Sequence, residues 1–153
     1  MAESLDELFD DNRTNAGTQR MYELLQDPAV AQLVVNSHTQ VFATYATGEV
    51  VHLERVFPST AAYLTWLGDL LKLTDAGVVD VAAYQGSVID GSFAADRTDL
   101  YGSVHVATRE LTRGDPILTV RKQPRVIYTL DDLWRAGVMS DAMRHFLELA
   151  VRG

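Results

Sequence analysis

The alternation of apolar and polar residues predicts six strands, each with one face toward a core. In the clearest run, Ile117–Lys122, Leu118 and Val120 share one face and Arg121 points to the other. Pro124 has no N–H to donate to a ladder, so this strand is expected to stop before it. The other five strands are expected at residues 31–36, 40–45, 49–56, 93–98 and 103–110.

Apolar residues at helical spacing, preceded by capping residues, predict the helices. Ser59 precedes the longest apolar stripe, in which Tyr63 and Trp66 are expected to pack in the core. Thr129 and Asp132 have the spacing of a capping box and open a later helix. Two shorter helices are expected, one from Thr18 to the Asp27-Pro28 pair and one from Asp75 to Gly86.

This order of elements predicts an α+β fold, in which a mostly antiparallel sheet of about six strands carries helices on one face. A length of 153 residues is typical of one domain. Residues 1–17 are expected to be a flexible acidic lead-in, and residues 18–153 a single α+β domain that ends in helices.

Composition and charge exclude several classes of protein. The chain has no cysteine, so it forms no disulfide and no thiolate metal site. Its net charge of -8 disfavours binding to nucleic acid, because the long-range field repels phosphate. No apolar run approaches the roughly 18 residues of a membrane-spanning helix, and the acidic start differs from a signal peptide. We therefore expect a soluble protein that is not exported.

The residues for an independent active site are missing. No glycine is followed by lysine, so the phosphate loop G-x-x-x-x-G-K-[ST] is absent and the chain is not a complete P-loop ATPase. No serine lies in a G-x-S-x-G elbow. We therefore predict no catalytic residue and no metal site. The histidines lie on separate elements without metal-ligand spacing, and they are His38, His52, His105 and His145.

Two stretches resemble a known family. LTVRKQPRVIYTLDDLWRAGVMSDAMRHFLELAVRG and, before it, DPAVAQLVVNSHTQVFATYATGEVVHLERVF are similar to the N-terminal domain of type II and type IV secretion and pilus-assembly motor ATPases, including conjugation and tight-adherence motors. In that family, a strand reading LTIRKF leads to a TLEDL-like helix, a second helix and then the phosphate loop. The resemblance covers roughly residues 27–153. It implies a PAS-like sheet and a chain that stops before the Walker A loop.

The resemblance assigns a role to one arginine. In the family, the arginine of the LTIRK-like strand reaches nucleotide phosphates bound on the ATPase domain, which implies that role for Arg121 and a weaker one for Lys122. The other interpretation is a solvated strand arginine paired with a nearby acid. The family has a second arginine in a preceding hairpin, whereas none follows Gly102-Ser103 here. Either Arg97 or Arg109 substitutes for it, or nucleotide contact through this domain is weakened.

For the whole protein, the resemblance implies a domain that is not catalytic alone. It would help to clamp nucleotide, to form a homo-hexameric ring with the ATPase domain of the same motor, and to contact inner-membrane secretion or pilus platform proteins. ATP and magnesium are implied only with that ATPase domain, and the expected location is cytoplasmic, at the inner face of the cell membrane. Two alternatives remain, a free-standing adaptor without the motor and a PAS-like domain that senses a small ligand.

Overall fold

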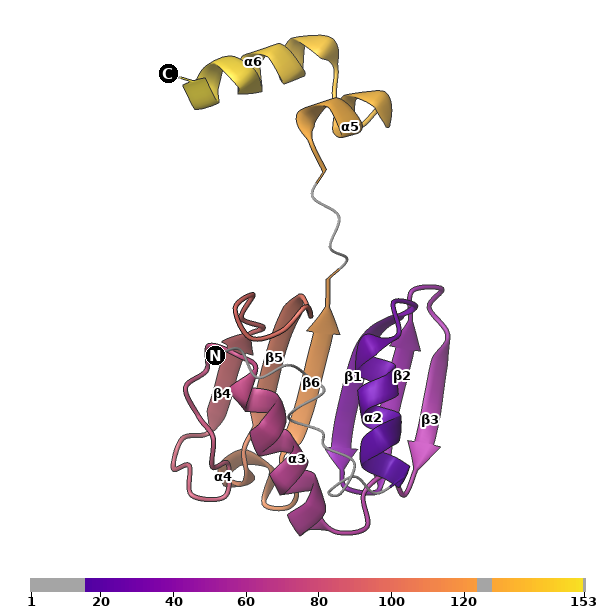
Figure 1. The fold of residues 1–153 in the computed structure, drawn as a ribbon, viewed down its shortest axis with the longest axis vertical. Coiled ribbons are helices and arrows are strands. Elements are labelled where there is room, and N and C mark those ends of the chain that lie inside the picture. The colour runs from indigo at the N-terminus through magenta and orange to yellow at the C-terminus, as the bar shows by residue number, and fades with distance from the viewer. Residues whose placement is uncertain (1–15, 124–127, 153) are drawn as a thin grey trace.

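The computed structural model describes residues 16–123 and 128–152. The elements form a six-stranded sheet, helices on one of its faces, and a helical pair at the C-terminal end (Figure 1). In chain order they are α2 (Ala16–Gln26), β1 (Val30–Ser37), β2 (Gln40–Tyr45), β3 (Val50–Glu54), α3 (Thr60–Lys72), β4 (Val88–Ser92), β5 (Gly102–Ala107), α4 (Arg109–Thr112), β6 (Ile117–Lys122), α5 (Leu130–Arg135) and α6 (Asp141–Arg152).

All five strand pairings in the sheet are antiparallel, and the strand order is β3-β2-β1-β6-β5-β4. The sheet therefore consists of two three-stranded meanders that join where β1 pairs with β6. Because β3 and β4 occupy opposite edges, the chain between them must cross one face of the sheet. It does so through α3, which lies over β5 and β6, while α2 lies over β1 and β2 on the same face (Figure 1). The predicted α+β class is confirmed.

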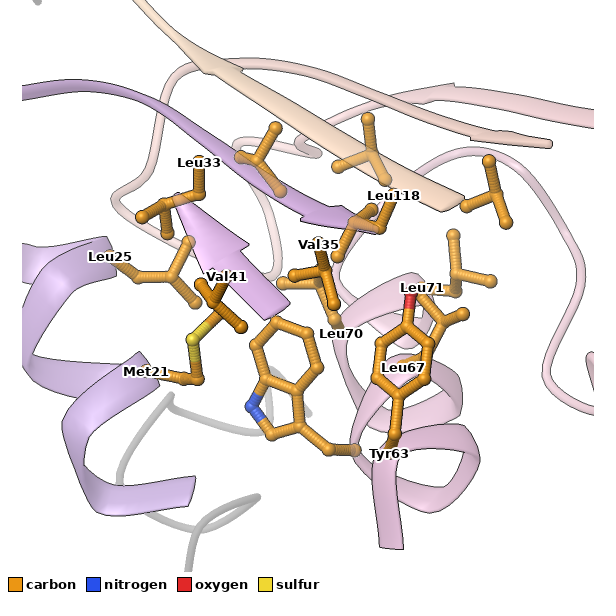
Figure 2. Close-up of a cluster of buried hydrophobic side chains, with 14 of the residues drawn as sticks. Met21, Leu25, Leu33, Val35, Val41, Tyr63, Leu67, Leu70, Leu71 and Leu118 are labelled. Atoms are coloured by element: carbon orange, nitrogen blue, oxygen red, sulfur yellow. The ribbon is translucent and has the colours of Figure 1, made fainter. Parts of the chain in front are cut away.

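The core lies between these two helices and the sheet. Figure 2 shows Met21 and Leu25 of α2 facing Leu33 and Val41, and side chains of α3 completing the cluster from the other side. Tyr63 and Trp66 are both buried, as expected from the apolar stripe. Burying an aliphatic or aromatic side chain stabilises a fold by roughly 1.5–3 kcal/mol, so this layer holds the helices on the sheet.

The local signals in the sequence placed several elements well. The strands predicted at 40–45 and 117–122 match β2 and β6 residue for residue. Ser59 caps α3 by accepting a hydrogen bond from the Ala62 N–H, and Thr129 and Asp132 form the predicted capping box of α5. The described part of α2 already includes Ala16, so Thr18 lies inside this helix and is not its cap. The lead-in predicted for residues 1–17 lies outside the described residues up to residue 15.

The prediction of a strand at 93–98 was wrong. The strand that pairs with β5 is β4, and the residues after it form turns on the way to Gly102. Because Asp and Gly have low strand propensity, Asp90 and Gly91 gave no strand signal and β4 was not predicted. A Cβ at Gly91 would lie 2.9 Å from atoms of Thr74 and Ala76, so this glycine allows a neighbouring segment to pack on the strand. The strand expected at 103–110 also ends earlier, because Arg109–Thr112 is a helical turn.

The helix expected from Asp75 to Gly86 is absent. Asp75 instead pairs with the end of β4: its carboxylate accepts a hydrogen bond from the Ser92 N–H, and its own N–H donates to the Ser92 carbonyl. Residues 77–80 have no regular structure, and a turn follows in which Asp80 accepts from the Ala82 and Ala83 N–H groups. Asp75, which the pattern predicted as a helix cap, is thus bonded to the end of β4 instead.

Candidate functional site

Arg121 lies on the face of the sheet that α2 and α3 leave open. Leu118 and Val120 of the same strand are fully buried on the other face, whereas Arg121 is exposed. Gln32 of β1 and Ser103 of β5 are its direct cross-strand neighbours. Among the described residues no carboxylate forms an ion pair with Arg121. Its planar fork of N–H donors is therefore open to an anion.

Gly102 sets the backbone beside Arg121. This glycine pairs with Lys122 across the ladder and has a φ of +142°, which L side chains rarely adopt. A Cβ built there would lie 2.0 Å from the carbonyl oxygen of Arg121, well inside contact distance. Only glycine allows β5 to start this close to β6, so Gly102 and Arg121 form one local arrangement.

Lys122 belongs to the other side of the sheet. It continues the row of Leu118 and Val120, and its ammonium donates a 2.5 Å hydrogen bond to the Asp27 carbonyl oxygen, where α2 ends. Burial lowers the pKa of Lys122, and the Asp27 charge opposes that shift. The two adjacent cations therefore point to opposite faces and do not converge on one phosphate.

The structure does not bring the two possible substitute arginines to Arg121. Arg97 donates hydrogen bonds to the Lys72 and Thr74 carbonyls at the end of α3, on the covered face. Arg109 donates to the Gly114 carbonyl, at the opposite end of β6 from Arg121. The residue opposite Arg121 on β5 is Ser103. This strand therefore places a hydroxyl, and not the second arginine of the resembling family, beside Arg121.

A pocket of about 400 Å³ opens beside Lys122 on the covered face. Five segments line it: the end of α2, the start of β1, the residue after β2, the connection from β4 to β5, and the end of β6. Most of its wall is apolar, and Leu25, Val30 and Leu100 contribute to that wall. Arg121 is not among the residues that line it.

A polar cluster at the other end of the sheet joins three elements. The Asp115 carboxylate accepts hydrogen bonds from the backbone N–H of His38 at 2.8 Å and from the Thr60 hydroxyl at 2.7 Å. It also lies 2.6 Å from Nδ1 of the His38 ring. Thr60 also approaches His38 at Nδ1, at 3.3 Å. A catalytic triad needs the acid and the hydroxyl on different ring nitrogens, so this cluster is not one.

The same cluster perturbs its acidic groups. Burial alone would raise the pKa of Asp115, but the hydrogen bonds from His38 and Thr60 outweigh it and hold that pKa below its usual range. Tyr63, whose hydroxyl donates to the Pro116 carbonyl, has its pKa raised by burial and secondarily by the Asp115 charge. Nothing local in the sequence links these residues, because they meet only through the fold.

The comparisons with known proteins concern the fold. No family model matches the chain, and no curated protein matches it. A solved structure, the VirB11 ATPase from the Brucella suis type IV secretion system in complex with sulphate, matches with a TM-score of 0.51 at 16% identity. The chain shares its fold with part of that ATPase. The match covers 90% of this chain and 44% of the VirB11 chain, so the chain spans less than half of that protein's length.

In the part of the chain that the structure describes, no helix has the length and apolar character needed to cross a membrane. Residues 16–123 and 128–152 also contain no group of three or more histidine or acidic residues placed to hold a metal ion.

Proposed function

We propose that this chain is the N-terminal domain of a secretion or pilus-assembly motor ATPase. Its shared fold with part of the VirB11 ATPase supports this, as does the resemblance of its strand-to-helix sequence to such motors. In this role the domain does no chemistry by itself. It contributes to a nucleotide site whose phosphate loop, ATP and magnesium belong to the ATPase domain.

The observation that carries the proposal is the position of Arg121. A guanidinium is always charged and offers two parallel N–H donors to phosphate oxygens. Arg121 is exposed on the open face, and the described residues supply no acid to neutralise it. A strand arginine held in an ion pair would be less available. The geometry therefore favours a contact with an external anion.

Helix α6 supports a contact with a further domain. Its polar side faces α5, where Arg144 pairs with Asp131 at 3.0 Å and lies over the Trp134 ring at 5.1 Å. Its apolar side is exposed, with Phe146 69% and Leu149 60% accessible. By contrast, α2 and α3 bury their apolar stripes against the sheet. In the proposed motor, the ATPase domain covers this side of α6. The assembled chains then form a hexameric ring, which contacts the membrane platform proteins.

We expect Arg121→Ala to lower the ATPase rate about tenfold or more in a polypeptide that joins this domain to its ATPase domain. The substitution removes a charge-assisted bond to phosphate worth roughly 1.5–3 kcal/mol. Lysine at this position keeps the charge but loses the fork, so Arg121→Lys should recover only part of the rate. Steady-state phosphate release measures this effect.

Arg113→Ala is the matched control, because Arg113 lies in the turn before β6, at the other end of that strand. The free energy of unfolding should hardly change for Arg121→Ala. If the two alanine variants have the same ATPase rate, Arg121 is a solvated surface residue and the phosphate-contact role is wrong.

The 153-residue chain alone should hydrolyse no ATP. It lacks the glycine-rich loop that cradles phosphates and the lysine that follows it. Turnover that co-purifies with the protein through several chromatographic steps, and exceeds a mock preparation, would contradict this. Reading the coding frame beyond residue 153 distinguishes a motor from a free-standing adaptor, because a motor requires a phosphate loop downstream.

A further inference from the structure

The pocket beside Lys122 combines an apolar wall with one cation. Lys122 is the last core-facing residue of β6, after Leu118 and Val120. An ammonium at this place interrupts an otherwise apolar row. Lys122 lines the pocket together with Leu25 and Leu100, and a lysine can lay its aliphatic stem along an apolar wall while its ammonium stays accessible.

The Lys122 ammonium keeps capacity for a ligand. An ammonium has three N–H donors, and the bond found among the described residues uses one, to the Asp27 carbonyl. That bond fixes the nitrogen at the pocket, which lowers the entropic cost of a second bond. Because burial disfavours the charged ammonium, a bound anion would stabilise the charge in return.

We propose that this pocket binds a small monocarboxylate with an apolar body, its carboxylate on the Lys122 ammonium and its body against Leu25, Val30 and Leu100. A volume of about 400 Å³ lies at the lower end of the range for small-molecule sites. Asp99 also lines the pocket, and Asp27 lies next to Lys122. Two acids beside one lysine disfavour a polyanion such as a nucleoside triphosphate, so the ammonium suits at most a ligand with one negative charge.

This site is independent of the proposed motor role. Arg121 lies on the open face of the sheet, whereas the pocket lies on the covered face. Carboxylate binding can therefore be measured on the isolated chain, whatever the outcome of the phosphate test. The pocket would give the domain a ligand-sensing capacity at the end of β6.

The test uses octanoate as the probe and 1-octanol as its uncharged counterpart. Nitrogen-15 NMR of the purified chain should show saturable shifts at the amides of Leu25, Leu100 and Gln123 with octanoate. 1-Octanol should bind about tenfold more weakly, because it lacks the charge-assisted bond. Both titrations use the unaltered protein, so they decide the proposal even if a variant fails to fold.

The chain contains only two lysines, which supplies a matched pair of variants. Lys122→Met should weaken octanoate binding about tenfold. Lys72→Met removes the lysine paired with Asp69 on α3 and should leave the affinity unchanged. Absence of saturable shifts at millimolar octanoate would overturn the proposal. Equal affinity for the alcohol, an unaffected Lys122→Met protein, or shifts confined to the apolar side of α6 would do so as well.

Discussion

Replacing Gly102 by alanine is expected to lower the free energy of unfolding by roughly 3 to 5 kcal/mol. The added Cβ would lie 2.0 Å from the Arg121 carbonyl oxygen, and the φ of +142° is strained for any L side chain. The obstacle is a backbone atom of the paired strand, at the end of the ladder between β5 and β6, so it cannot rotate away as a side chain could. The start of β5 must separate from β6, and Arg121 moves with it. Urea denaturation of the purified chain measures the loss.

Gly48→Ala is the control for this prediction. Gly48 also has a positive φ, +88°, but a Cβ there would meet nothing within 4 Å. Its substitution should cost about 1 to 2 kcal/mol, from backbone strain alone. If both variants lose the same stability, the contact between Gly102 and Arg121 is not the reason for the glycine.

Replacing Asp115 by alanine should lower the free energy of unfolding by roughly 3 kcal/mol, because hydrogen bonds to a charged group contribute about 1.5–3 kcal/mol each and are not fully additive. The carboxylate is 12% exposed and holds the β1–β2 turn through His38 and the first residue of α3 through Thr60. Its loss leaves these donors without their acceptor in a partly buried place. Thermal or urea unfolding at neutral pH provides the measurement.

A matched exposed pair is available for comparison. Asp90 lies 2.5 Å from His105, with side chains 65% and 55% exposed, so Asp90→Ala should cost roughly 0 to 1 kcal/mol. The effect of Asp115→Ala on stability should also depend on pH. The pKa of Asp115 is lower in the folded state than its ordinary value of about 3.9, so its stabilising contribution is present above that value. It is lost as the pH falls through the lower folded pKa.

The stability difference between the native chain and the Asp115→Ala variant should therefore be constant from neutral pH down to about 4 and shrink below it. A difference that grows in acid, or that is no larger than the one for Asp90→Ala, would show that the Asp115 cluster does not join the elements as described.

The candidate site was predictable only in part. The two-residue alternation of side chains along a strand placed Arg121 on the exposed face, because the apolar Leu118 and Val120 were expected to face the core. The resemblance gave Lys122 a weaker phosphate role beside Arg121, and nothing in the sequence showed that its ammonium would meet a carbonyl on the opposite face. The Asp27 carbonyl lies 95 residues away in sequence. That the neighbouring strand presents Ser103 to Arg121 depends on the register between β5 and β6.

Short-range sequence signals were enough to predict where two helices begin. Ser59 and Thr129 cap their helices wherever those helices are placed, because each cap bonds to an N–H within three residues. The strand β4 needed more: Asp90 and Gly91 disfavour a strand, and its pairing with β5 overrides that preference.

The sequence by itself determined an α+β chain, the face of most strands and the caps of two helices, since these follow from spacing over a few residues. Only the tertiary structure decided that the first and last strands are neighbours at the centre of the sheet and that α3 crosses one face to connect its two edges. It also brought His38, Thr60 and Asp115 together at one end of the sheet. Such contacts depend on how distant segments pack, because burying the shared core of the two meanders compensates for the entropy of closing long loops.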